Sequence, residues 1–398
     1  MAVNRTTGGT LIIAGTCIGA GMLALPVAMA SGGFLGSCVA LIIFWLAMAL
    51  TGLYVLEVNL YLPAESNFIS MAKLTLGRVG EGVAWVTFML LLYSLMAAYL
   101  SAGGDLVESA VSAFAQIELQ HWVKPLPWML VAAVAIYLGA RTVDGLNRLL
   151  FCGLVLTYFL MVFFTLPHLH WAYLVPGKPL SLLAAFPILS TAFGYHVVIP
   201  SMRLYLSGAV NNLVKIILLG SFITLMVYLF WDLVVFGTIP VSGVLSLETI
   251  QESGQPATKI AATLAALTQN TSLVMIIEFF VFFAIATSFI GIALALFDFL
   301  ADGLKIPRTP LGKVWVALLT FIPPLTFALL FPKGFILALS YAGVFVAILH
   351  GILPAALAWA GRRRGLPVLY RAPGGTLGMI VIVLFSTLII AMQIFVNS

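Results

Sequence analysis

The sequence predicts an all-α membrane protein with eleven transmembrane helices in a single domain, residues 1–398. Three observations lead to this fold class. Apolar residues make up 63% of the 398 residues and charged residues only 8%, whereas soluble domains carry roughly 25% charged residues. The apolar residues form long continuous runs, and about 20 such residues cross the hydrocarbon core as a helix. Lysine and arginine fall mostly between alternate pairs of these runs, as in the cytoplasmic loops of multispan proteins.

The same composition excludes several classes of protein. A soluble enzyme, a disordered chain and a nucleic-acid-binding domain all need far more charged surface. A membrane β-barrel would show short alternating segments, and a channel would need a ring of charges or a filter-like carbonyl repeat. The sequence also shows no cluster of catalytic or metal-spaced residues. We therefore expect no enzyme activity, no cofactor and no nucleic-acid partner.

Eleven apolar runs follow one another along the chain. The first is taken as a span rather than a signal peptide, because it carries glycines and a proline and no clean cleavage site follows. Residues 63–79 contain Lys73 and Arg78 and are expected to form a short surface helix, while residues 238–270 predict a capping loop with one short helix. The expected spans are 8–30, 34–62, 80–112, 127–140, 149–167, 181–206, 213–237, 271–300, 312–331, 335–360 and 375–396.

The distribution of cationic residues predicts the orientation. With the N-terminus in the cytoplasm, only four of the 18 Lys and Arg residues fall outside: Lys124, Lys178, Lys259 and Lys333. All the others, including Arg308, fall on the cytoplasmic side, as the positive-inside rule requires. We expect a multi-pass membrane protein with its N-terminus in the cytoplasm and its C-terminus outside.

The first span carries a predicted helix break near residues 15–21. Gly15, Gly19 and Gly21 lie close together at mid-membrane and Pro26 follows. Glycine weakens a helix and proline removes a donor. Such glycines also suit close helix packing, and the first span alone does not separate the two interpretations.

The sixth span favours the break, because its own glycine and proline, Gly194 and Pro200, again follow hydroxylated residues at mid-span. Interrupted helices at matching places of two halves indicate a transporter binding site. We therefore expect two inverted repeats, 8–168 and 181–360, with one extra helix at 375–396.

Five segments resemble one known family. The run AGTCIGAGMLALP resembles the first-helix signature of the bacterial hydroxy/aromatic amino acid permeases, and the other four segments resemble parts of their sixth, eighth, ninth and tenth helices. This resemblance implies the leucine-transporter-like fold of the amino acid–polyamine–cation superfamily. It also implies uptake of an aromatic amino acid, tyrosine before tryptophan or phenylalanine, by symport with a cation, usually a proton; permeases for other neutral amino acids such as serine are a remoter alternative. The segments are 14–26, 193–201, 286–302, 331–335 and 341–343.

The resemblance and the breaks together suggest a substrate site. The substrate carboxylate needs N–H donors and its ammonium needs carbonyl acceptors, which the two breaks supply. The aromatic ring needs an apolar pocket. Phe193, next to Gly194, is the first choice among its walls, although each aromatic residue also suits simple packing. The predicted substrate-binding residues are Ala14, Gly15, Thr16, Gly19, Ala20, Gly21, Tyr93, Ala97, Ser101, Ser190, Thr191, Phe193, Gly194, Tyr195 and Phe289.

Two coupling ions remain open. For a proton, the resemblance implies a place for Glu57 beside the breaks, where it would pair with freed N–H groups. His196 is the other candidate, because the ordinary pKa of histidine lies near physiological pH. The other acidic residues, Asp232 among them, are expected mostly at the membrane interface. For sodium, carbonyls and hydroxyls of Ala14, Cys17, Thr287 and Ser288 would form an oxygen-rich site between the first and eighth helices. Some proton-coupled relatives place a lysine there from the fifth span, which has none here. The resemblance also implies a protein of the bacterial inner membrane that works as a monomer.

Overall fold

The computed structural model describes residues 5–64, 66–174, 176–207, 209–269, 271–307, 309–331, 334–367 and 369–397. Every regular element within them is a helix, which confirms the all-α class, and one isolated bridge pairs Gly33 with Pro176. The longer helices are α1 (Arg5–Cys17), α3 (Gly33–Asn59), α4 (Phe68–Ala115), α5 (Pro125–Leu138), α6 (Ala140–Thr165), α9 (Val210–Thr238), α11 (Pro256–Thr268), α12 (Thr271–Gly303), α13 (Pro310–Leu330), α14 (Gly334–Val346), α15 (Leu353–Arg363) and α16 (Gly375–Asn397). The shorter ones are η1 (Ala20–Ala24), α2 (Leu25–Ala28), η2 (Ala30–Gly32), η3 (Leu166–His168), η4 (Trp171–Tyr173), η5 (Pro179–Ala185), α7 (Phe186–Thr191), η6 (Tyr195–Val198), α8 (Ile199–Tyr205), α10 (Leu247–Ser253) and η7 (Ala347–Ile352).

Most predicted spans correspond to a helix that can cross a membrane. Within the described chain nine helices are long and apolar enough, and the bent pair of α1 with the segment Ala20–Ala28 would make a tenth. The counterpart of the predicted span 127–140 is α5, which has 14 residues. At about 1.5 Å per residue it falls short of a hydrocarbon core of about 30 Å. The count of eleven and the inverted repeat therefore stay predictions.

The two long connections contain helices. In 63–79 a helix begins at Phe68, where the Asn67 side chain accepts from the Ser70 N–H at 2.9 Å. Gly77, with φ of 71°, separates this short helix from the main part of α4. The expectation of one helix in 238–270 is wrong, because two form there, α10 and α11. Gly254 adopts φ of 70° at the end of α10, which stops that helix and lets a second one start.

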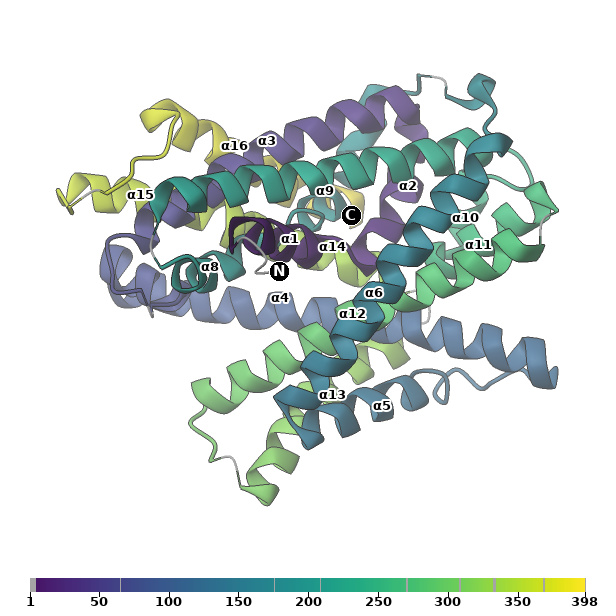
Figure 1. The fold of residues 1–398 in the computed structure, drawn as a ribbon, viewed down its shortest axis with the longest axis horizontal. Helices are drawn as coiled ribbons and strands as arrows, with labels where there is room; N and C mark the ends of the chain where they lie inside the picture. The colour runs from purple at the N-terminus through teal and green to yellow at the C-terminus, as the bar shows by residue number, and fades with distance from the viewer. Residues whose placement is uncertain are drawn as a thin grey trace.

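The broken first helix lies in the middle of the bundle (Figure 1). There α1 packs on α9 and contacts η6 of the sixth span. Around it α3 packs on α9, α14 on α4, and α12 on α6. Large buried side chains concentrate near this centre, including Trp231, Tyr228 and Phe193. The core therefore surrounds the two predicted breaks.

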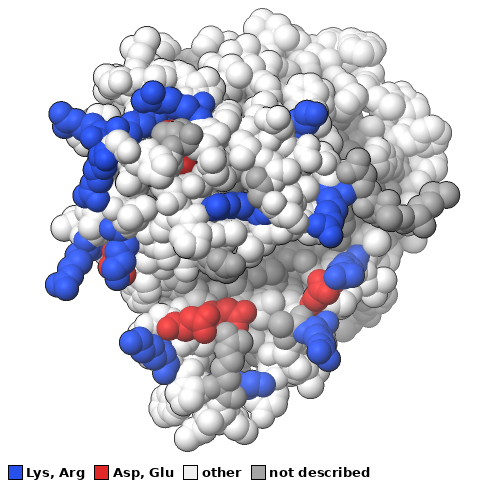
Figure 2. Space-filling model, turned by 60° about the vertical axis from the view of Figure 1, so that its left-hand side comes forward, with Lys and Arg blue, Asp and Glu red and all other residues white. Residues whose placement is uncertain are grey.

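Several connections expected in the cytoplasm lie together at one end of the molecule. The end of α15 and the beginnings of α9 and α16 lie at the left of Figure 1. Arg203 donates to the Leu62 carbonyl at 2.8 Å, and Arg364 donates to the Leu74 carbonyl at 2.6 Å. Figure 2 brings this end forward and shows Lys and Arg spread over it. Arg308 and Lys333, which also entered the predicted orientation, lie outside the described residues.

Candidate functional site

The helix break predicted near residues 15–21 is found at 18–19. α1 ends at Cys17, and the chain continues through η1 and α2 after a bend of 48°. Gly19 has an extended backbone with φ of −175° and ψ of −157°. A side chain on Gly19 would overlap Ser288 of α12. Glycine is therefore needed here for the close approach of the two segments.

The sixth span is interrupted in the same way. α7 ends at Thr191, residues 192–194 form a turn, and η6 leads into α8. Pro187 and Pro200 lie in the first turns of α7 and α8, where a missing N–H costs no helical hydrogen bond. Each proline thus starts a half-helix, and Gly194 lies between them.

One hydroxyl group on α9 joins the two breaks. Tyr228 donates to the carbonyl oxygens of Cys17 and Ala192, each at 2.7 Å. One turn further on, the Trp231 indole donates to the Met22 carbonyl at 2.9 Å. Both side chains are fully buried. α9 therefore holds the freed carbonyls of both interrupted helices in one arrangement.

A cavity of about 590 Å³ lies between the breaks. Apolar side chains of α4 and α6 form one wall, and α12 and η7 complete it. Arg148 lines the cavity although 79% of its side chain is exposed, whereas Met22, Leu23 and Ala24 of η1 are fully buried. The cavity is therefore open beside Arg148 and closed beyond η1.

Nine of the predicted site residues line this cavity. They come from the first break with the adjoining parts of α1 and η1, from the end of α7 and the turn after it, and from α12. These three segments are far apart in the sequence. They are Gly15, Thr16, Cys17, Gly19, Gly21, Thr191, Gly194, Thr287 and Ser288.

The predicted ring-binding residues lie elsewhere. Tyr93 donates to the Leu319 carbonyl of α13 at 2.8 Å. Phe193 packs edge-on against Tyr228, and the Tyr195 hydroxyl donates to the Met48 carbonyl at 3.0 Å. Others that do not line the cavity are Ala97, Ser101 and Phe289, which are directed toward other helices, and Ser190, whose hydroxyl contacts the Gly343 carbonyl of α14.

Residues of α4, α6 and η7 that the sequence reasoning missed take these places. Tyr99, Phe151, Asn147 and His350 all line the cavity. Asn147 Oδ1 and both ring nitrogens of His350 are buried without a hydrogen-bond partner among the described residues. A histidine in the middle of a span was the signal that could have identified His350. Asn147 lies beside Arg148, just before the predicted span 149–167, and carried no such signal.

Glu57 does not occupy the expected place beside the breaks. Its carboxylate accepts from Arg362 at 2.7 and 2.6 Å and from the Ala372 N–H at 2.8 Å. Tyr61 also donates to it at 2.8 Å. The expectation that freed N–H groups of the breaks pair with Glu57 is wrong, because its carboxylate is bound by Arg362 of α15 and by the Ala372 N–H instead.

The expected coupling residue His196 belongs to a buried pair. Its ring stacks on His350 with centroids 4.4 Å apart and an angle of 13°. Its Nε2 lies 2.8 Å from the Thr51 hydroxyl, and its Nδ1 has no partner among the described residues. His350 stands in the π-helical turn η7. The pair therefore connects the second break with the wall of the cavity.

Asp232, one turn after Tyr228 on α9, is fully buried within the protein. Neither carboxylate oxygen has a hydrogen-bond partner among the described residues. A charged carboxylate in such a place costs several kcal/mol or more, whereas the neutral acid costs much less. Neighbouring helices therefore enclose the whole side chain, while the expected position of Asp232 near the membrane interface stays a prediction.

The four predicted sodium ligands already take part in internal hydrogen bonds. The Ala14 carbonyl accepts from the Ile18 N–H at 3.0 Å, and the Cys17 carbonyl accepts from Tyr228. Thr287 donates to carbonyls of its own helix. Ser288 Oγ accepts from the Ala20 N–H at 2.9 Å. The Ala20 N–H, one of the predicted donors for the substrate carboxylate, is therefore engaged as well.

The chain is similar over almost its whole length to known bacterial proteins. Residues 3–393 match the profile of the tryptophan/tyrosine permease family. The chain is 35% identical over 392 residues to tyrosine-specific transport system 1 of Haemophilus influenzae, covering 97% of this chain and 96% of that protein. It is 33% identical over 402 residues to the tryptophan-specific transport protein of the same organism (98% and 96%). It is 34% identical over 384 residues to that of Pseudomonas aeruginosa (95% and 91%).

Proposed function

Because the chain belongs to the tryptophan/tyrosine permease family, whose members are transport proteins rather than enzymes, we propose that it takes up an aromatic amino acid by cation symport. Its apolar helices and bacterial relatives make it a multi-pass protein of the inner membrane. The observation that carries the proposal is the cavity of about 590 Å³ between the two breaks. This volume lies within the roughly 300–1,000 Å³ typical of small-molecule sites. We further propose a cytoplasmic N-terminus and an outside C-terminus.

The cavity offers separate places for the three parts of the substrate. The bare backbone of Gly19 and Gly21 at the first break suits the carboxylate, and carbonyls of the two breaks suit the ammonium. The ring lies against the apolar wall, which consists of Phe88, Leu91, Leu92, Leu95 and Phe151. This pose places the ring on residues other than those predicted from the sequence.

Asn147 supports tyrosine or tryptophan over phenylalanine. Its buried Oδ1 lacks a donor among the described residues, and a phenol O–H or an indole N–H would supply one. A site built to hydrogen-bond a substrate discriminates strongly against the analogue that lacks the group. We keep tyrosine ahead of tryptophan as the substrate, and relatives named for each are similarly close.

The proposed transport cycle uses the two breaks as hinges. In this structure the cavity is open beside Arg148, the side that the predicted orientation assigns to the cytoplasm. α1, the half-helix before the first break, contributes Leu11 and Ile12 to the lining of the cavity. Tyr228 and Trp231 bind carbonyls at and after this break and hold the segment beyond it in the closed arrangement. We propose that alternating access requires the segments around these bonds to rearrange.

A proton is the favoured coupling ion. Asp232 lies on the same helix as the hydroxyl that joins the breaks, and its unpaired carboxyl group can bind a proton in the closed interior. His196 and His350 offer a second buried pair of titratable rings. The sodium alternative needs oxygens of Ala14, Cys17, Thr287 and Ser288 that are engaged in hydrogen bonds here. Glu57 is paired with Arg362. It remains a coupling candidate only if the proton binds to this ion pair.

The test is uptake into proteoliposomes of the purified protein. Radiolabelled tyrosine, tryptophan and phenylalanine are supplied under a pH gradient or a Na⁺ gradient imposed separately. We expect concentrative uptake of tyrosine with the pH gradient alone. Asp232→Asn should abolish this uptake while tyrosine counterflow persists, and Glu248→Gln on exposed α10 should change neither. Uptake driven only by Na⁺ would transfer the coupling role to the α1–α12 oxygens, and no uptake of any aromatic amino acid would refute the function.

A further inference from the structure

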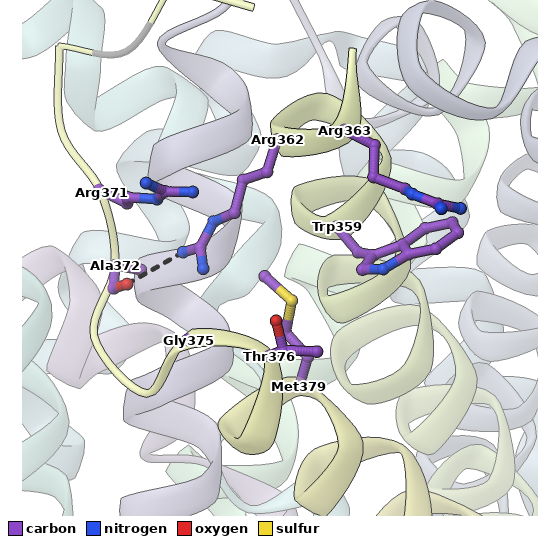
Figure 3. A pocket seen from close by; sticks show the side chains of 8 residues that line it. All are labelled: Trp359, Arg362, Arg363, Arg371, Ala372, Gly375, Thr376 and Met379. Atoms are coloured by element: carbon purple, nitrogen blue, oxygen red, sulfur yellow. Dashed lines mark hydrogen bonds between the residues drawn. The ribbon is translucent and has the colours of Figure 1, made fainter. Parts of the chain in front are cut away.

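A second cleft, of about 610 Å³, lies between the end of α15 and the beginning of α16. It shares no lining residue with the transport cavity. Three of the eight side chains around it are arginines (Figure 3), and none is acidic. The lining residues are Trp359, Arg362, Arg363, Arg371, Ala372, Gly375, Thr376 and Met379.

The three arginines have different roles. Arg362 is neutralised by Glu57, and it also donates to the Ala372 carbonyl at 2.9 Å, which fixes the α15–α16 connection. Arg363 lies over the Trp359 ring at 4.7 Å from its centroid, and Arg371 extends from the opposite side of the cleft (Figure 3). Both are exposed, and neither pairs with a carboxylate in the described part of the chain. The cleft therefore carries two uncompensated positive charges.

The start of α16 adds to this positive potential. Its first N–H groups lack helical acceptors, and the helix dipole places partial positive charge at this end. Gly375, with φ of 53°, lines the cleft and exposes its backbone there without a side chain. The Thr376 hydroxyl stands beside it and can donate to an anion.

The surroundings of the cleft are apolar on one side. In the first two turns of α16, Leu377 and Val381 are 73% and 54% exposed. The most apolar part of this helix is only 28% buried, so it faces lipid in a membrane. Trp359 lines the cleft and is itself partly exposed, a residue type enriched at the membrane–water interface. The cleft therefore lies where charged surface meets lipid-facing surface.

We propose that this cleft binds the phosphate group of an anionic phospholipid, with the acyl chains along the outer face of α16. Guanidinium groups and helix N-termini are the groups that bind phosphate in proteins. A free phosphate ion would use the same contacts but would gain nothing from the exposed apolar residues next to them. The site is on the side assigned to the cytoplasm, whose leaflet is anionic, and it does not depend on which amino acid is transported.

The test measures binding of dioctanoyl phosphatidylglycerol to the full-length protein in a neutral detergent. We expect the double variant Arg363→Gln/Arg371→Gln to weaken binding at least tenfold. The matched control Arg78→Gln/Arg141→Gln removes two exposed cations elsewhere and should change binding less than twofold. Dioctanoyl phosphatidylcholine, whose phosphate carries a compensating ammonium, should bind at least tenfold more weakly than phosphatidylglycerol.

A second variant guards against misfolding. Thr376→Glu puts a carboxylate at the start of α16, where it favours the helix but repels a phosphate. It should abolish lipid binding without lowering the melting temperature. Three results would overturn the proposal: equal binding of phosphatidylcholine, unchanged binding in both cleft variants, or displacement of the lipid by inorganic phosphate at equal concentration, which would make it a free-phosphate site.

Discussion

The Tyr228→Phe substitution tests whether one hydroxyl group joins the two helix breaks. The hydroxyl lies 2.7 Å from both the Cys17 and Ala192 carbonyls, and it has only one hydrogen to share between them. Phenylalanine keeps the ring and its packing but removes this donor. Two buried carbonyls then lose their shared donor, and because it has one hydrogen, the loss corresponds to one buried group left unpaired, about 1–3 kcal/mol.

The expected effect on transport follows from that free energy. If the bond is made only when both breaks adopt the binding arrangement, losing about 1–3 kcal/mol lowers the fraction in that arrangement by roughly 5–150-fold. The apparent KM for uptake in proteoliposomes should rise by the same factor. A lower melting temperature of the purified variant should accompany it.

Tyr158→Phe provides the matched control. The Tyr158 hydroxyl, on α6, donates to the Val227 carbonyl of α9 at 2.9 Å. The variant therefore loses a tyrosine hydrogen bond that also involves α9 but does not involve either break. We expect a KM within about twofold of the unmodified protein. Equal KM values for Tyr228→Phe and Tyr158→Phe would refute the idea that the Tyr228 hydroxyl couples the breaks.

Three further substitutions probe the packing that holds the site. Gly19→Ala should abolish uptake with normal membrane insertion, because the added methyl group would overlap a side chain of α12. The control Gly145→Ala places its methyl group in open space and should transport normally. Uptake by Gly19→Ala would contradict the close approach of the two segments. Glu57→Gln should lower the free energy of unfolding by about 3–5 kcal/mol because it leaves the buried Arg362 without its partner charge; an unchanged melting temperature would count against this. Gly343→Ala should lower the melting temperature, since its Cβ would overlap a carbonyl of α7, and a melt like that of the unmodified protein would show that α14 can move away.

Features that depend on neighbouring residues could be predicted from the sequence. The apolar runs matched the membrane-crossing helices because lipid forces every backbone group to pair within its own segment. Both breaks were found because glycine and proline act locally on the helix that contains them. The nine correctly placed cavity residues come from those breaks and from one small, hydroxylated stretch of α12.

Which side of each helix faces the cavity could not be predicted from the sequence. In a soluble protein a polar face shows which side is buried, but here lipid-facing and core-facing residues are both apolar. On α4 the sequence reasoning chose Tyr93 and Ala97, whereas Leu92, Leu95 and Tyr99 line the cavity. Adjacent residues differ by about 100° around a helix, so an error of one position moves the predicted wall to another face.

The sequence by itself determined the membrane class, the family resemblance and the places where two helices break, because these are properties of composition and of short segments. Only the tertiary structure decided which distant groups meet. Glu57 pairs with Arg362 across 305 positions, and Tyr228 reaches Cys17 across 211. These partners depend on how apolar helices pack against each other. When both faces of a helix are apolar, the sequence has no polar–apolar period that would show which residues meet.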